Sequence, residues 1–246
     1  MAERPRALLL KFPGTNCDAE TARALRLVGF EADILPIAEL TTDMLRGYHL
    51  VVFSGGFSYG DYVMSGRFAE LELQRRLGNG LEHFVYSGGF ALGICNGFQI
   101  LARTGLLPEG TLIENVSGRY QCQWVGLQKS GESPLLKLLP ETFEFPAAHA
   151  EGRFVTTSPE QAEGYVRDGL AALTYTEDFN GSTARIAAMQ DETGRVFGLM
   201  PHPERFIYKN QHHDPDWSGD AEWGWGYYFF KALHEAVIES QMTMAK

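Results

Sequence analysis

FALGICNGFQ (residues 90–99) contains a short apolar run, followed by one cysteine between two glycines. The run Phe90–Ile94 predicts a buried strand, and the residues from Asn96 onward predict a helix that Gly105 ends. Cys95 would then occupy a sharp strand-to-helix turn, where glycines on either side relieve the crowding of nearby backbone. The helix N-terminus favours a thiolate, so Cys95 is a candidate nucleophile. The alternative is a small core cysteine beside a glycine-rich turn.

Around this turn, the first half of the sequence alternates predicted strands and helices. The predicted strands are nearly continuous apolar runs, at residues 7–12, 32–35, 50–53 and 90–94. Asp18 is a predicted N-cap for a helix that carries Ala22, Leu25 and Val28 and ends at Gly29. This alternation predicts an α/β fold with a mostly parallel central sheet and helices on both faces.

After Gly105 the pattern changes to that of an additional antiparallel part. Residues 118–125 alternate, with Tyr120, Cys122 and Trp124 on the face predicted to point inward. Further strands are predicted at residues 154–157, 171–176, 185–189 and 196–200. Residues 227–240 predict an amphipathic helix through Phe230, Leu233 and Val237. No repeat or linker interrupts the sequence, so we expect a single domain over residues 1–246, with a loop and helix at 208–246.

Composition narrows the class of protein. The chain has 246 residues, of which 44% are apolar and 21% charged, as in ordinary globular domains. Its net charge of −10 argues against binding of nucleic acid, which needs clustered Lys and Arg. Its three cysteines have no paired spacing, which argues against a disulfide framework and against a zinc site. No stretch is long enough for a signal peptide or a membrane span, so a cytoplasmic protein is expected.

A thiol nucleophile needs a base, and His202 has the most suggestive setting of the seven histidines. It lies between two prolines directly after the predicted strand 196–200. In extended chain, residues two apart point the same way, so Glu204 would lie beside His202 and orient it. Ligands of open α/β sheets bind at the carboxyl ends of the strands, where Cys95 and His202 are both expected. The alternative is a turn histidine beside a solvated carboxylate.

A glycine-rich loop, SGGFSYGD (residues 54–61), follows the third predicted strand. It lacks the complete signature of a phosphate-binding loop, so nucleotide binding has little support. The N–H of Gly56 or Phe57 is instead expected to join the N–H of Asn96 in an oxyanion hole for acyl transfer. The alternative is a plain glycine-rich turn.

Taken together, these motifs resemble a known family. GICNGFQ (residues 93–99) and PHPE (201–204) are similar to the motifs of class I, or triad, glutamine amidotransferases. FPGTNCD (12–18), GGFSYGDY (55–62) and AHAEGR (148–153) resemble the glutaminase subunits of phosphoribosylformylglycinamidine synthase. The resemblance extends from about residue 7 to Arg205, which is most of the chain.

The resemblance implies a flavodoxin-like glutaminase domain. Cys95 would attack the side-chain amide of L-glutamine to form a γ-glutamyl thioester and ammonia, with His202 as base and then acid and Glu204 orienting it. Ammonia would pass to a large synthetase subunit that uses ATP and Mg²⁺ to convert formylglycinamide ribonucleotide to its amidine in purine synthesis. A small third subunit is expected to complete the complex, and no cofactor or metal is expected in this chain itself.

Other residues have two interpretations each. Gln99, four residues after Cys95, forms part of the glutamine pocket together with Phe57, or only supports the turn. His149, Glu151 and Arg153 (a charged cluster in the sequence) line the rim of the site or form a solvated loop. Cys17 follows the first predicted strand, and it either lies near the crevice or has a structural role beside Asp18. The structural role is favoured, since no base lies near Cys17 in the sequence.

Two segments depart from the family pattern. Residues 208–225 are rich in His, Asp and Trp and longer than expected; neighbouring His and Asp side chains point in different directions, which favours a surface loop over a metal site. Phe179 replaces an expected proline in the run 178–182. Two other functions remain open: a free-standing cysteine hydrolase of γ-glutamyl or peptide amides, which would need no partner, and a non-enzymatic scaffold protein, which would not need Cys95, His202 and Glu204 together.

Overall fold

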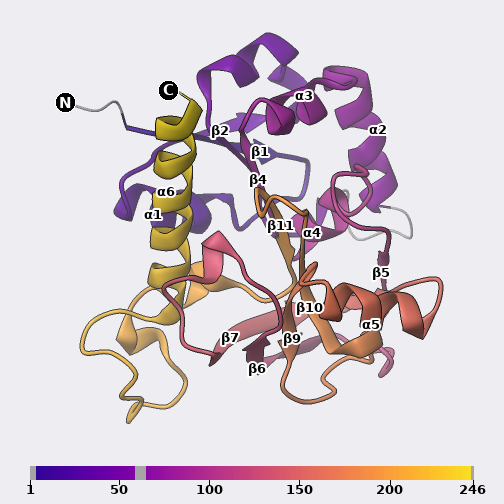
Figure 1. The fold of residues 1–246 in the computed structure, drawn as a ribbon, viewed down its shortest axis with the longest axis vertical. Coiled ribbons are helices and arrows are strands. Elements are labelled where there is room, and N and C mark those ends of the chain that lie inside the picture. Colours follow the sequence, from indigo (N-terminus) through magenta and orange to yellow (C-terminus); the bar gives the residue numbers. More distant parts are fainter. Residues whose placement is uncertain (1–3, 59–64, 245–246) are drawn as a thin grey trace.

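The computed structural model describes residues 4–58 and 65–244, so the end of the glycine-rich loop (59–61) lies outside the described residues. A sheet of nine strands forms its centre (Figure 1), in the order β2 (Glu31–Pro36), β1 (Arg6–Lys11), β3 (Leu50–Phe53), β4 (Phe90–Ile94), β11 (Val196–Leu199), β10 (Ile186–Gln190), β9 (Ala171–Tyr175), β6 (Gln121–Lys129) and β7 (Thr142–His149). Two further strands, β5 (Thr111–Ile113) and β8 (Arg153–Val155), form a separate antiparallel pair.

The first five strands of this order are parallel, and the remaining four are antiparallel to their neighbours. Counted along the chain, the parallel part has the order 2-1-3-4-5, which is the flavodoxin-like arrangement. Strands β3, β4 and β11 are buried along their whole length, which explains their continuous apolar sequences. The predicted fold class, including the additional antiparallel part, is therefore confirmed.

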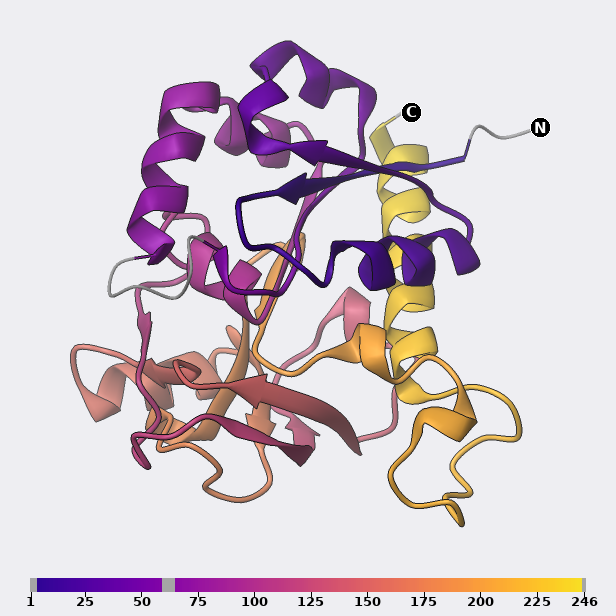
Figure 2. The ribbon, with the colours of Figure 1, turned by 180° about the vertical axis from the view of Figure 1, so that it is seen from behind.

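Helices lie on both sides of the parallel part. The helices of the molecule are α1 (Asp18–Leu27), α2 (Ser65–Leu77), α3 (Gly80–Tyr86), α4 (Asn96–Leu101), α5 (Pro159–Arg167) and α6 (Trp225–Met244). Helices α1 and α6 lie together on one side, and α2, α3 and α4 lie on the other (Figures 1 and 2). The predicted C-terminal helix is α6, which buries Phe230, Leu233 and Val237 as expected. No helix within the described ranges is both long and apolar enough to cross a membrane.

Two details of the predicted elements are wrong. Asp18 is the first residue of α1 rather than its N-cap; its carboxylate accepts a hydrogen bond from Lys11 Nζ at 2.6 Å instead of capping the helix. The alternating segment forms the antiparallel strand β6, but Cys122 is exposed and the buried face carries Val125 and Leu127. The alternation begins at residues 120–123, which lie outside the core and are largely exposed to solvent. The alternation of these residues therefore does not identify the buried face of β6.

Strand β7 was missed because Pro146 interrupts it. A proline lacks the N–H that a central strand needs, so it argues against a strand. β7 is the last strand of the sheet, and proline is tolerated at such an edge. The carbonyl of Pro146 accepts a hydrogen bond from the backbone N–H of His202 at 2.7 Å. The antiparallel part therefore bends back over the carboxyl ends of β4 and β11, where the candidate site lies.

Candidate active site

Cys95 occupies the strand-to-helix turn between β4 and α4 with a strained backbone. Its φ is 52° and its ψ −111°, in a region that residues other than glycine rarely adopt. The turn is held on both sides: the N–H of Cys95 donates to Leu199 O at 2.8 Å, and its carbonyl accepts from Phe98 N at 2.9 Å. Such strain persists only where the surroundings enforce it, and it directs the thiol away from the sheet.

The glycines flanking Cys95 are required by close backbone approach. A Cβ at Gly93 would lie 2.6 Å from the carbonyl oxygen of Gly97, and a Cβ at Gly97 would overlap the carbonyl of Phe53. The prediction that glycine relieves crowding at this turn is confirmed.

His202 and Glu204 form a buried pair beside this turn. His202 Nδ1 lies 2.6 Å from Glu204 Oε1, and the two side chains are 1% and 0% exposed. The proximity arises differently than expected: Pro203–Arg205 form a 3-10 helix that begins at the proline, rather than an extended chain. Since an ionised carboxylate can only accept, Nδ1–H donates to Glu204 and leaves Nε2 free for a proton from a thiol.

The charges around His202 favour its protonated form. Burial by itself would lower the pKa of the imidazole, but the negative charge of Glu204, followed by that of Cys95, raises this pKa well above the ordinary value. Nε2 is buried and has no hydrogen-bond partner among the described residues. His202 is thus suited to accept a proton and to hold it within the pocket.

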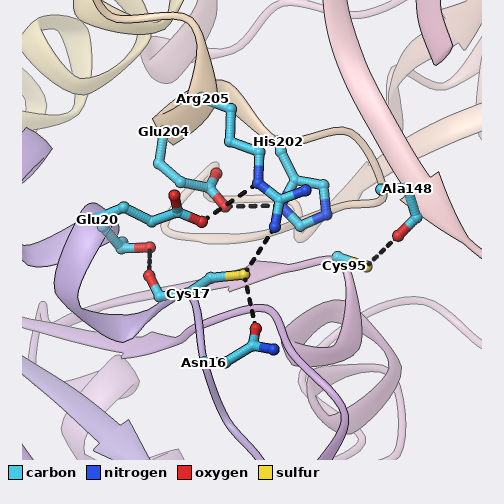
Figure 3. Close-up of polar contacts among 9 residues, drawn as sticks. Asn16, Cys17, Glu20, Cys95, Ala148, His202, Glu204 and Arg205 are labelled. Atoms are coloured by element: carbon cyan, nitrogen blue, oxygen red, sulfur yellow. Dashed lines mark hydrogen bonds and ion pairs between the residues drawn. The ribbon is translucent and has the colours of Figure 1, made fainter. Parts of the chain in front are cut away.

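Cys17 lines the same pocket as Cys95 and His202, which agrees with the less favoured of its two interpretations, a place near the crevice. Its Sγ is 3.2 Å from Arg205 Nη2 and 3.3 Å from Asn16 Oδ1 (Figure 3). Burial raises the pKa of the Cys17 thiol, although neighbouring His202 partly opposes this shift. The loop after the first parallel strand opens onto the same edge of the sheet as Cys95, which brings Cys17 to the site although no base lies near it in the sequence.

Gly55 lies between the side chains of Cys17, Cys95 and His202. A Cβ at this position would lie 2.9 Å from His202 Cε1, 3.2 Å from Cys17 Sγ and 3.5 Å from Cys95 Cβ. The neighbouring Gly56 has a φ of +143°, and a Cβ there would approach Asn16 N within 2.7 Å. The glycine-rich loop therefore passes directly through the site, and Gly55 is a residue of the site that the sequence interpretation missed.

The predicted oxyanion donors border the same pocket. Gly56 and Asn96 both line it, together with Phe57. The N–H of Phe57 donates to Gly14 O at 3.0 Å and is therefore occupied, which leaves Gly56 as the donor of this loop. An oxyanion hole formed by Gly56 and Asn96 stays a prediction.

Gln99 and Phe57, the predicted substrate-binding residues, also line the pocket. Gln99 Oε1 accepts from Asn96 Nδ2 at 2.8 Å, and its Nε2 donates to Glu151 O at 2.5 Å. Gln99 thus joins the strand-to-helix turn to the segment after β7, which fits a role in supporting the turn, and its contact with glutamine stays a prediction. Phe57 is 43% exposed and stacks against Tyr120 at the rim, with ring centroids 6.4 Å apart.

The cluster expected from His149, Glu151 and Arg153 is only partly at the site. His149 and Glu151 line the pocket, whereas Arg153 Nε donates to Gly181 O. His149 is neutral rather than charged, since burial, followed by the charge of His202, lowers its pKa to about 4. Its Nδ1 contacts Asn115 Oδ1 at 3.1 Å, and its buried Nε2 has no partner among the described residues. Phe179, the departure from the family pattern, packs edge-on against the His149 ring at 5.4 Å.

A metal ion at this site would compete with the chemistry of the thiol and the imidazole. Donor atoms of Cys17, His202 and Glu204 lie within 4.8 Å of one another. The Nδ1 of His202 is already bonded to Glu204, and its Nε2 is the atom that faces the thiols. The arrangement therefore fits a nucleophile, a base and an orienting carboxylate better than a metal centre.

Comparisons with known proteins agree with this geometry. Residues 4–235 match the model of the CobB/CobQ-like glutamine amidotransferase domain. Phosphoribosylformylglycinamidine synthase subunit PurQ of Dehalococcoides mccartyi is 39% identical over 233 residues, covering 88% of this chain and 90% of that protein. The same subunit of Thermotoga maritima is 39% identical over 207 residues, covering 83% of this chain and 89% of that protein.

Solved structures show the same likeness. The PurLQS structure from Thermotoga maritima aligns with a TM-score of 0.75 and 32% identity, covering 96% of this chain and 99% of that one. A glutamine amidotransferase from the same organism aligns with a TM-score of 0.56 at 20% identity, covering 82% of this chain and 77% of that one, which shows a shared fold. This chain belongs to the CobB/CobQ-like glutamine amidotransferases and, among them, to the PurQ family of phosphoribosylformylglycinamidine synthase subunits.

Proposed function

We propose that this chain is the glutaminase subunit of a phosphoribosylformylglycinamidine synthase. The observation that carries the proposal is the arrangement at the strand-to-helix turn: a strained Cys95, and a buried His202 whose Nδ1 is bonded to Glu204 while its Nε2 is free. Curated PurQ relatives that match most of the chain support the assignment of this arrangement to glutamine hydrolysis.

In the first half-reaction, Cys95 is the nucleophile and His202 the base. His202 Nε2 takes the thiol proton, and the thiolate attacks the side-chain carbonyl carbon of glutamine. The N–H groups of Gly56 and Asn96 stabilise the oxyanion, a contribution typically worth ~3 kcal/mol for each donor. The imidazolium then gives its proton to the leaving nitrogen, so ammonia departs and a γ-glutamyl thioester remains on Cys95.

In the second half-reaction, the same groups act on water. His202 Nε2 removes a proton from a water molecule that attacks the thioester, and glutamate leaves as the thiol is restored. Glu204 holds the imidazole in one tautomer through both steps and stabilises its positive charge.

The pocket also suits a free amino acid. Arg205 and Glu151 line it with opposite charges, which suit the carboxylate and ammonium groups of glutamine, although Arg205 Nε also pairs with Glu20 at 3.2 Å. Gln99 and Phe57 border the same space and are proposed to contact the substrate.

Ammonia is proposed to pass to the synthetase subunit, because free ammonia would otherwise be lost to solvent. The PurLQS structure supports association with a PurL partner, and we extend this to a small third subunit. The partner, rather than this chain, is proposed to use ATP and Mg²⁺ to convert formylglycinamide ribonucleotide to formylglycinamidine ribonucleotide.

The three free cysteines fit a reducing compartment such as the cytoplasm.

The test is release of glutamate from glutamine by the chain alone and with PurL, the third subunit, ATP, Mg²⁺ and formylglycinamide ribonucleotide. Weak activity that rises strongly in the mixture and disappears in Cys95→Ala is expected. Equal activity with and without partners would indicate a free-standing hydrolase instead. No glutamate in either case would indicate a scaffold protein.

A further inference from the structure

Away from the active site, two imidazoles converge on one carboxylate. His212 Nε2 lies 2.8 Å from Glu144 Oε1, and His213 Nε2 lies 3.2 Å from Glu144 Oε2. Glu144 belongs to β7, and the histidines follow the 3-10 helix Lys209–Gln211 in the long loop after the catalytic turn. Neighbouring side chains were expected to point apart, but these two rings lie 4.5 Å from each other. The two imidazole rings lie on the same side because both pack against Trp124, with ring centroids 4.6 and 4.9 Å from its own.

We propose that Glu144, His212 and His213 bind one divalent transition-metal ion of the zinc class. Their donor atoms lie within 4.8 Å of one another, so a small shift of each side chain brings all of them to an ion. Two imidazole nitrogens and a carboxylate are a donor set that zinc accepts. The side chain of His212 is 2% exposed and that of His213 is 50% exposed, so the site has a fixed inner side and an open outer side where water completes the coordination.

The surroundings of His212 suit both the metal-bound and the metal-free protein. Its Nδ1 lies 3.1 Å from the carbonyl oxygen of Asp214 and 3.0 Å from the N–H of the same residue. With an ion on Nε2, Nδ1–H donates to that carbonyl, the usual support for a histidine ligand. Without an ion, Nε2–H donates to Glu144 and Nδ1 accepts the Asp214 N–H. Binding of the ion therefore moves the ring proton of His212 from Nε2 to Nδ1. The ring N–H has a hydrogen-bond acceptor in both states, so it is never left buried without a partner.

The ion would connect the long loop to the strand that borders the active site. Glu144 lies two residues before Pro146, whose carbonyl holds the backbone of His202 at 2.7 Å. The His212 ring also packs against Phe206, directly after Arg205, at 5.1 Å. The ion is therefore expected to stabilise the catalytic segment without contacting the reacting atoms.

The test separates this site from the cysteines and from His202. Zinc is titrated calorimetrically into full-length protein in which Cys17, Cys95 and Cys122 are replaced by alanine, which removes every thiol ligand. Glu144→Gln and His213→Ala are made in this background. Glu141→Gln and His83→Ala, which change an exposed glutamate and an exposed histidine elsewhere, serve as matched controls.

One zinc ion per chain is expected in the background and in both controls, with binding at least tenfold weaker in Glu144→Gln and His213→Ala. Zinc should also raise the melting temperature of the background protein but not of His213→Ala, because a ligand stabilises the state that binds it. His213 is half exposed, so its alanine variant keeps the test valid if Glu144→Gln fails to fold. Unchanged affinity in His213→Ala, or no binding at micromolar zinc, would overturn the proposal and leave the three side chains as a hydrogen-bonded anchor.

Discussion

Glu204→Gln should slow turnover while leaving glutamine binding nearly unchanged. The substitution keeps the size of the side chain and an oxygen that accepts the proton of His202 Nδ1, but it removes the buried negative charge 2.6 Å away. Glu204 itself does not line the pocket, so it has no direct contact through which to alter affinity for glutamine. The effect should therefore appear in kcat rather than in KM.

The magnitude follows from the electrostatics of the pair. Two unit charges ~4 Å apart interact by about 4 kcal/mol at an effective dielectric constant of about 20. The neutral amide of the variant retains roughly half of this through its hydrogen bond, so the imidazolium in the transition state loses ~2 kcal/mol, or about 30-fold in kcat.

The variant should also change the dependence of kcat on pH. Glu204 raises the pKa of His202, so the imidazolium persists to higher pH than in an unperturbed histidine. Without that charge the imidazolium loses its proton at lower pH, and the alkaline limb of the profile should move to lower pH. Glutamate release is measured in the complete complex at several pH values, with Glu72→Gln, which alters a surface pair with Arg76, as the control. An unchanged kcat and an unmoved alkaline limb would remove Glu204 from the mechanism.

Three further variants probe the other parts of the site. Cys95→Ala should abolish glutamine-dependent synthesis and leave ammonia-dependent synthesis intact in the complex; loss of both activities would show a structural role. Gly55→Ala should reduce kcat/KM by about 100-fold or more, since the new methyl group lies between nucleophile and base. The control Gly164→Ala, in helix α5, should retain activity and gain ~0.5–1 kcal/mol in the free energy of unfolding. Near-normal activity of Gly55→Ala would contradict this spacing of the side chains. His149 has a pKa of about 4 in the folded protein and near 6.5 when unfolded, so its burial costs stability as pH falls through this interval, by about 3 kcal/mol at the acid end. His149→Gln should therefore lose less stability than wild type in urea unfolding between these pH values, and parallel curves would refute the assignment.

Local signals account for what could be predicted. The glycines around Cys95 are required by close contacts with nearby backbone, and the apolar strands are buried along their whole length. Both features can therefore be predicted from the local sequence. The same holds for the pairing of His202 with Glu204, two residues apart, even though the backbone between them is a 3-10 turn rather than extended. The predicted buried face of β6 is wrong because Cys122 on that face is exposed to solvent. Only Trp124 of the predicted face is covered, by the distant His212, and this contact leaves no local pattern in the sequence.

The rest of the site depends on contacts that no local pattern encodes. Gly55 and Cys17 come from loops after two different strands, and they meet His202 only because β1, β3, β4 and β11 are parallel and end at the same edge. Their roles follow from the order of the strands, which the sequence leaves open between several topologies. Cys17 in particular has no base nearby in sequence and acquires one through folding.

The position of β7 explains why the catalytic histidine depends on both parts of the sheet. β7 is at the far end of the strand order, four strands from β11, yet it lies close enough for Pro146 O to accept the His202 N–H. Because this bond joins two backbone groups, a substitution removes it directly only where proline replaces His202 and deletes the N–H. Other changes that act through β7, including those at Glu144, must move the strand itself. They would displace His202, His149 and Ala148, whose carbonyl accepts a hydrogen bond from Cys95 Sγ at 3.8 Å. Coupling of the long loop to catalysis should therefore affect the geometry of the nucleophile and base jointly, rather than the pKa of either group alone.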